Sequence, residues 1–333
     1  MTRPGRIALT TLAVVLGATL VLAGALWIVA GRLLRGGDRM FEFSPDLPGD
    51  LIPSTELTMD GAGMQDTRQL SRYSFAFRTN ALGFRGLEVD VDSARVVMVL
   101  GDGYGFGTSV DGEHTLCDEL NRLEEGKRPR TVCVNAAAPG MALADMFQYL
   151  REKGHRLKPA IVLVVMSWDD VWEMERPVVM RDIFRCMHTS RLCLLKAMYY
   201  RLVVGVFKMK DKVLDNSDRS EELMHRKLLA GFLELLAAVR DFAGGWGGRL
   251  VVLTEYVEYD TVRKGIAGLG IPLVVLKDRL GDRIEYAPDG HWAASTHLAA
   301  ARLVAEWLAG EEGRSLDRGS VRTGANARDV RER

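Results

Sequence analysis

The sequence predicts an α/β protein with a doubly wound, mostly parallel sheet, because short apolar runs alternate with segments of helical periodicity. The strand candidates RVVMVL, TVCVN, AIVLVVM, RLVVLT and IPLVVL lie at 95–100, 131–135, 160–166, 249–254 and 271–276. Continuous apolar runs of this length are typical of strands buried on both faces. The helical segments lie at 114–124, 142–154 and 221–242. We therefore expect three layers, α/β/α.

Composition indicates one globular domain without a nucleic-acid partner. The 333 residues include 44 Lys and Arg and 44 Asp and Glu, so the formal net charge is zero. A neutral chain has no overall field that attracts nucleic acid. Without its apolar N-terminal segment and its polar tail the chain keeps about 270 residues, enough for one large domain.

An uncharged apolar segment, 7–30, follows the short N-terminal flank 1–6. As a helix it spans about 36 Å, which exceeds a hydrocarbon core of about 30 Å. A cleaved signal peptide is the alternative, but its apolar region usually has only about 7–15 residues. We therefore expect a single transmembrane helix in contact with membrane lipid. Arginines flank the segment on both sides, so charge does not fix its orientation.

The remaining chain divides into a connector, a domain and a tail. Residues 31–90 are a connector and lead-in rich in Gly, Pro and Asp, and residues 91–310 carry the strand and helix pattern. Within that domain, 180–215 is a helical insertion with an apolar stripe, either packed as a cap or lying on the membrane. Residues 311–333 are polar and lack aromatic residues, so we expect disorder.

The four cysteines are Cys117, Cys133, Cys186 and Cys193. Cys186 and Cys193 enclose a short loop that could form a disulfide in an oxidising compartment, and free thiols in a reducing compartment are the alternative. The chain has no CxxC and no paired histidines nearby, so the spacing fits no zinc motif and we expect no metal. The loop GDGYGFG lacks the spacing of a dinucleotide-binding loop, and we expect no cofactor.

Chemically suggestive motifs follow the predicted strands, where doubly wound sheets place their sites. They are GDGYGFG at 101–107, NAAAPG at 135–140, MSWDD at 166–170 and DGHW at 289–292, and FRTNALGFRG lies upstream at 77–86. Over about residues 70–310 these motifs resemble, in order, the blocks of SGNH/GDSL-type hydrolases of the membrane-anchored bacterial type. The resemblance implies a flavodoxin-like fold, chemistry on ester bonds, and a domain on the periplasmic side of the membrane.

The resemblance also implies roles for individual residues. Asp289 and His291 match the acid and base of the family, and Gly140 and Gly103 match positions that lend backbone N–H groups to an oxyanion hole. We expect Asp102 to accept backbone N–H bonds in the turn. The alternative for the pair is that Asp289 only caps the helix that starts near residue 292, leaving His291 as a surface residue.

Two departures put catalysis in doubt. Gly103 stands where the family has its nucleophilic serine, and acyl transfer by that route needs a hydroxyl activated by histidine. The hydroxyls of Tyr104, Thr108 and Ser109 hold other positions on the turn, so none is an obvious substitute. Asp169 aligns with an asparagine of the oxyanion hole, and a carboxylate there would repel a developing oxyanion.

Whether the chain is an enzyme therefore stays open at this point. We expect a catalytically degenerate protein that binds an acylated envelope glycan or lipid. The first alternative is an active esterase or O-acetyltransferase that uses His291 with water or a non-standard nucleophile, and the second is an envelope scaffold component. The sequence indicates no particular protein partner.

Overall fold

The computed structural model describes residues 24, 51, 53–66, 69–92, 94–167, 171, 218–257 and 259–325. Apart from Gly24, the predicted membrane segment lies outside these residues, and so do the insertion at 180–215, Asp169, Cys186 and Cys193. Within the described part of the chain, no helix combines the length and the apolar character needed to span a membrane.

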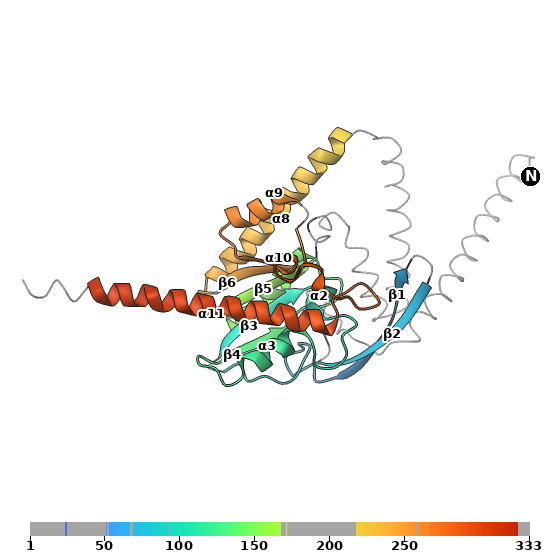
Figure 1. Cartoon of the computed structure of the whole chain (residues 1–333), viewed down its shortest axis with the longest axis horizontal. Coiled ribbons are helices and arrows are strands. Elements are labelled where there is room, and N and C mark those ends of the chain that lie inside the picture. Colours follow the sequence, from blue (N-terminus) through green and yellow to red (C-terminus); the bar gives the residue numbers. More distant parts are fainter. Residues whose placement is uncertain are drawn as a thin grey trace, which may run out of the picture.

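The main sheet has five parallel strands, and Figure 1 shows them at the centre of the domain. The strands are β3 (Arg95–Gly101), β4 (Thr131–Asn135), β5 (Ile161–Met166), β6 (Arg249–Thr254) and β7 (Leu273–Val275). Their order is β4-β3-β5-β6-β7. This is the flavodoxin-like order, so the predicted doubly wound sheet is confirmed. The last strand is shorter than predicted because a helix already begins at Leu276.

Helices cover both faces of this sheet. They are α2 (Gly103–Phe106), α3 (Leu116–Glu124), α4 (Leu143–Glu152), α8 (Asp218–Gly244), α9 (Asp260–Gly268), α10 (Leu276–Leu280) and α11 (Ala294–Ala325), with 3-10 turns at Gly154–Leu157 and Gly281–Arg283. Helix α11 packs along α3, whereas α8 packs on α4 and α9 (Figure 1). The chain passes from β3 outward to β4 and then back across β3 to β5. The direction of winding therefore reverses between β3 and β5, which is where such sheets place their sites.

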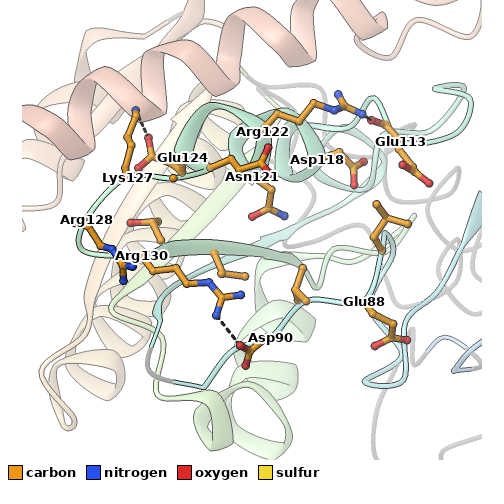
Figure 2. A pocket seen from close by; sticks show the side chains of 16 residues that line it. Glu88, Asp90, Glu113, Asp118, Asn121, Arg122, Glu124, Lys127, Arg128 and Arg130 are labelled. Carbon is orange, nitrogen blue, oxygen red and sulfur yellow. Dashed lines mark hydrogen bonds and ion pairs between the residues drawn. The ribbon is translucent and has the colours of Figure 1, made fainter.

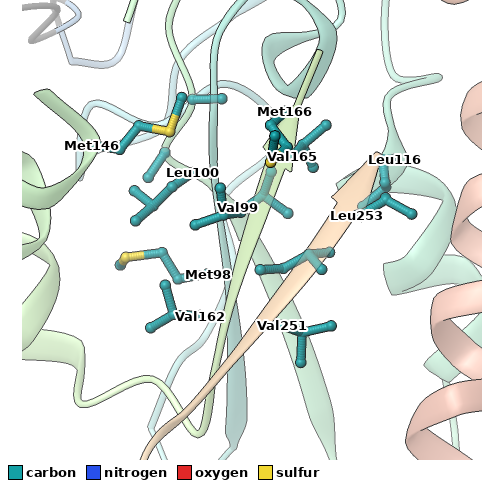
Figure 3. Close-up of a cluster of buried hydrophobic side chains, with 14 of the residues drawn as sticks. Met98, Val99, Leu100, Leu116, Met146, Val162, Val165, Met166, Val251 and Leu253 are labelled. Carbon is teal, nitrogen blue, oxygen red and sulfur yellow. The ribbon is translucent and has the colours of Figure 1, made fainter. Parts of the chain in front are cut away.

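The core lies between the sheet and its two helix layers. Figure 3 shows apolar side chains on both faces of the central strands, including Met98 and Leu100 of β3 and Val162 of β5, all without exposed surface. At about 25 cal/mol per Å² of apolar area removed from water, this burial is the main force that holds the strands in place. The carboxyl ends of β3 and β5 are thus a rigid support for the loops that follow them.

A disulfide joins Cys117 in α3 to Cys133 in β4, with 5.1 Å between the Cα atoms. The spacing along the sequence points to a different possible pair, Cys186 and Cys193. Helix α3 begins at a capping box, because Thr115 and Asp118 exchange hydrogen bonds between side chains and backbone N–H groups. The helix start is therefore fixed close to the disulfide.

The lead-in contains an antiparallel hairpin that the sequence analysis does not predict. Strands β1 (Glu56–Asp66) and β2 (Gln69–Arg78) pair from Glu56 opposite Arg78 to Asp66 opposite Gln69. After β2, the Asn80 side chain accepts the N–H groups of Leu82 and Phe84, which turns the chain back toward the main sheet. The N–H of Arg85 then donates to the carbonyl of Asn135 at the end of β4.

Helix α11 is the last element of the described part of the chain. Helix α11 continues to Ala325, well into the segment 311–333 for which the polar composition predicts disorder.

Candidate functional site at the carboxyl ends of the strands

The turn between β3 and α2 requires glycine at Gly101 and a cap at Asp102. A Cβ atom on Gly101 would lie 2.7 Å from the carbonyl oxygen of Val165 in β5, so the two strands could not keep this spacing with a larger residue. Oδ1 of Asp102 accepts the N–H of Tyr104 at 2.9 Å and caps the helix. The chain therefore leaves β3 in a fixed direction and brings Gly103 to the end of the sheet.

A second tight turn carries the acid and base candidates. Tyr286 and Trp292 form an antiparallel bridge, and the N–H of Ala287 donates to the carbonyl of His291 at 2.7 Å. Gly290 takes a positive φ of 88°, which glycine adopts without strain. The turn places Asp289 and His291 on the same side of the chain.

Asp289 and His291 form a hydrogen-bonded pair. Nδ1 of His291 lies 2.8 Å from Oδ2 of Asp289, and the other carboxylate oxygen accepts the backbone N–H of His291 at 3.2 Å. The Asp289 side chain is 5% exposed and the His291 side chain 28%. Burial opposes ionisation of Asp289, but interactions with His291 and Ser109 outweigh it and lower the pKa of the carboxyl. An ionised Asp289 favours the proton on Nδ1, which leaves the Nε2 lone pair available.

The imidazole of His291 lies directly over Gly103. A Cβ atom on Gly103 would be 2.3 Å from Nε2 of His291 and 2.9 Å from Oγ1 of Thr108. The ring nitrogen thus occupies the volume that any side chain at this position would need. Thr108 is 6% exposed, and among the described residues its hydroxyl has no hydrogen-bond partner. The structure brings Gly103, His291, Asp289 and Thr108 together, although the sequence analysis did not favour Thr108.

Aromatic rings and a carboxylate hold the histidine turn. The Tyr104 ring lies 4.9 Å from the His291 ring and 5.4 Å from that of Trp292, and its hydroxyl donates to the carbonyl of Gly290. Glu255, just after β6, accepts hydrogen bonds from the indole of Trp292 and the hydroxyl of Tyr286. Burial raises the pKa of Tyr286, and the hydrogen bond to the negatively charged Glu255 raises it further. Both arms of the turn are therefore fastened to the end of β6.

Arg85 fixes the opposite loop, and the sequence analysis did not identify it. Its guanidinium donates to the carbonyls of Phe106, Gly107 and Val110 at 3.2, 2.8 and 2.5 Å. It also lies 4.8 Å from the centre of the Phe106 ring. Burial is the main cause that lowers the pKa of Arg85, to about 10. Arg85 occurs in the lead-in motif FRTNALGFRG, which is the feature of the sequence that could have indicated its role.

His297 lies next to this site but faces the core. It has no exposed surface, and its Nδ1 accepts the N–H of Leu116 at 3.2 Å. Burial, followed by the charges of Arg85 and His291, lowers the pKa of His297 to about 3. His297 is therefore neutral at ordinary pH and joins α11 to the start of α3.

Two predicted site residues remain, Gly140 and Asp169, and the structure describes only the first. Ala138, in the loop after β4, donates its N–H to the carbonyl of Gly101 at 3.1 Å, so this loop lies against the β3 turn. Gly140 follows in the same loop with a φ of 77°. Asp169 lies outside the described residues, so its predicted role stays a prediction.

The blocks after β3 and β4 and the Asp-x-His turn before α11 thus meet at the reversal of a flavodoxin-like sheet. The fold is a doubly wound, mostly parallel α/β sheet in the flavodoxin-like strand order. The domain has the hydrogen-bonded pair of Asp289 and His291, and Gly103 carries no hydroxyl.

The solved structures that this chain resembles match it at low sequence identity and low TM-score. A lipase/acylhydrolase from Enterococcus faecalis is 13% identical with a TM-score of 0.41, over 65% of this chain and 96% of that chain. TesA is 14% identical with a TM-score of 0.40, over 63% and 96%. A catalytic mutant of an acetylxylan esterase from Geobacillus stearothermophilus is 13% identical with a TM-score of 0.38, over 63% and 92%. No protein-family model and no curated protein matches the chain. Identities and TM-scores this low transfer no activity.

A groove of about 540 Å³ lies elsewhere on the domain (Figure 2). It is lined by the first residues of β4, the loop 124–130 before them and the segment 87–90, so it lies toward the amino end of β4. Its charges are largely paired, as in Arg130 with Asp90 and Lys127 with Glu124. The groove does not include the Asp289–His291 pair.

Proposed function

We propose that this chain is a membrane-anchored protein whose SGNH hydrolase-like domain binds an acylated envelope glycan or lipid beside His291 without forming a seryl-enzyme. One observation carries the proposal. Where serine-dependent acyl transfer needs a hydroxyl, the chain has Gly103, and the imidazole of His291 fills the space above it. The pair with Asp289 is kept in a geometry that can still accept a hydrogen bond from a ligand.

An acyl-transfer activity is the second candidate, and one observation favours it. Asp289 is buried, ionised and bonded to Nδ1 of His291, which is the arrangement that orients a catalytic imidazole. A pair that served only to cap a helix would not need the ring bonded to the carboxylate. An esterase or O-acetyltransferase would use this pair with a group other than a serine at position 103.

The anchor at 7–30 and a periplasmic location belong to the same proposal. The disulfide between Cys117 and Cys133 supports it, because disulfides persist in oxidising compartments outside the cytoplasm. Fusions of alkaline phosphatase and of a cytoplasmic reporter to the C-terminus test the topology. Activity of the phosphatase fusion alone is expected, and activity of the cytoplasmic reporter alone would reject the location.

Binding is tested on the full-length chain by calorimetric titration with an acetylated oligosaccharide and its deacetylated counterpart. We expect binding of the acetylated form only, weakened in His291→Ala and unchanged in His114→Ala, whose histidine is paired with Glu119 on the surface. Release of acetate is followed in the same samples. Equal binding of both sugars, or none, would reject the proposal for glycans, and vesicles that contain acylated lipid then test the lipid form.

A further inference from the structure

We propose that the groove beside β4 binds a small organic cation, such as an alkylammonium or alkylguanidinium compound (Figure 2). Its volume of about 540 Å³ is in the range of sites for small molecules. The apolar side chains of Leu87, Val89 and Val132 line it together with charged ones, so a short alkyl chain finds contacts there. Because the groove does not include the Asp289–His291 pair, the inference is independent of the proposed function.

Asp118 gives the groove a buried carboxylate with one oxygen unengaged. The residue is 9% exposed and lines the groove. Its Oδ2 accepts the N–H and the hydroxyl of Thr115 at 3.1 and 2.6 Å, whereas its Oδ1 has no hydrogen-bond partner within the described part of the chain. A Cβ on Gly86 would lie 3.2 Å from Oδ1, so this oxygen lies next to the start of the groove segment 87–90. Oδ1 is therefore placed to accept a hydrogen bond from a ligand.

The charge of Asp118 lacks a bonded cation among the described residues. The charges of Arg85 and Arg122 act on it, but both guanidinium groups are bonded elsewhere, that of Arg85 to backbone carbonyls and that of Arg122 to Glu119. Burial outweighs these influences and raises the pKa of Asp118. A buried carboxylate is costly unless it is paired, so an ammonium group in the groove would supply the missing partner.

The remaining charges favour a cation over an anion. Six acidic and four basic side chains line the groove, which leaves an excess of negative charge. Figure 2 shows Glu88 and Glu113 on the same side of the groove as Asp118, with Arg128 on the other side. Within the described residues Glu88 forms no ion pair, and one of its oxygens accepts a backbone N–H. The positive end of a ligand should therefore face Asp118.

Thr131 adds a second buried polar group to the groove. It is the first residue of β4, which lies at the edge of the sheet. Further along this edge the strand is covered, because the Asn121 side chain binds the N–H and the carbonyl of Cys133, and the N–H of Arg85 donates to the carbonyl of Asn135. Thr131 is 5% exposed, and its hydroxyl has no hydrogen-bond partner among the described residues. A hydroxyl oxygen can accept an N–H from the same ligand.

The test is an NMR titration of the full-length chain with n-butylammonium, beside butanol and butyrate as neutral and anionic probes of similar length. Butylammonium should shift the amide signals of residues 87–90 and of Thr131, and the other two probes should not. Asp118→Asn should weaken binding at least about tenfold, because a charge-assisted hydrogen bond is lost. Asp278→Asn is the matched control, since that exposed carboxylate is paired with Arg263 outside the groove, and its affinity should equal that of the unmodified chain.

Two exposed positions keep the test decisive if Asp118→Asn folds poorly, because Asp118 also belongs to the capping box of α3. Glu88→Gln should weaken binding about two- to fivefold, as expected for an exposed charge. Arg128→Gln should leave the affinity unchanged or increase it, because it removes a like charge from the groove. Thermal unfolding verifies that each variant is folded.

Several outcomes would overturn the inference. Equal shifts with butyrate or butanol would show that the groove does not select a cation. Absence of shifts in the groove, or shifts confined to the turn 286–292, would place binding elsewhere or nowhere. Weaker binding in Arg128→Gln would show that the ligand is held by the basic side of the groove instead of by Asp118.

Discussion

Gly103 and His291 are complementary in shape, because the imidazole takes the volume that a side chain at 103 would fill, with Nε2 2.3 Å from the Cβ position. The ring is held there by Asp289 and lies 4.9 Å from the Tyr104 ring. The absence of a side chain at Gly103 therefore leaves the space that the His291 ring occupies.

Gly103→Ala should therefore lower the free energy of unfolding by about 1–3 kcal/mol, since the new methyl group must displace a packed ring. Urea denaturation measures the difference. Gly268→Ala is the matched control, because a Cβ there meets nothing within 4 Å, and it should be neutral or slightly stabilising. Equal stability of Gly103→Ala and the unmodified chain would show that the ring is free to move.

Arg85→Met should cost at least about 2 kcal/mol of folding free energy, because buried carbonyls of Phe106, Gly107 and Val110 lose a charged donor. Thermal and urea unfolding measure the loss. Arg130→Met is the control, since its pair with Asp90 is exposed and should contribute less than about 1 kcal/mol. Similar effects of the two substitutions would contradict the role of Arg85 in fixing the loop 106–110 around Thr108.

His297 should make the protein less stable in acid. Its pKa falls from 6.5 to about 3 on folding, so between these values the unfolded chain binds a proton that the folded chain does not. Stability is therefore lost as the pH falls from about 6.5 toward 3, by up to about 1.4 kcal/mol per pH unit. Urea denaturation at pH 7 and pH 4.5 should show a smaller pH dependence in His297→Gln than in the unmodified chain. Parallel pH profiles would show that His297 is protonated in the folded state.

The disulfide should stabilise the domain through the unfolded state. Cys117 and Cys133 are 16 residues apart, and closing a loop of this length is worth about 3 kcal/mol. The double variant Cys117→Ala/Cys133→Ala should lose that amount, and reduction should bring the unmodified chain to the same value. Non-reducing peptide mapping should recover the two cysteines in one cross-linked pair. Alkylation of both in unreduced, unfolded protein would contradict the pairing.

The sheet could be predicted because its strands are short, continuous apolar runs that alternate with helical segments. This pattern is typical of strands buried on both faces of a parallel sheet. The turn motifs could be placed because parallel strands end at one edge of the sheet. The hairpin of β1 and β2 could not, since its segment is rich in residues that favour turns. The pairing of Cys117 with Cys133 also depends on how a helix packs on a strand, which no spacing along the chain specifies.

The sequence by itself determined the α/β class, the edge of the sheet at which the motifs meet, and the presence of glycine at position 103. Local composition suffices for these, because burial imposes an apolar pattern and a residue type is read directly. Only the tertiary structure decided that the imidazole of His291 lies over Gly103. It also decided that the Arg85 guanidinium binds the loop after β3. Both contacts join residues far apart along the chain, and their geometry follows from the packing of the whole domain.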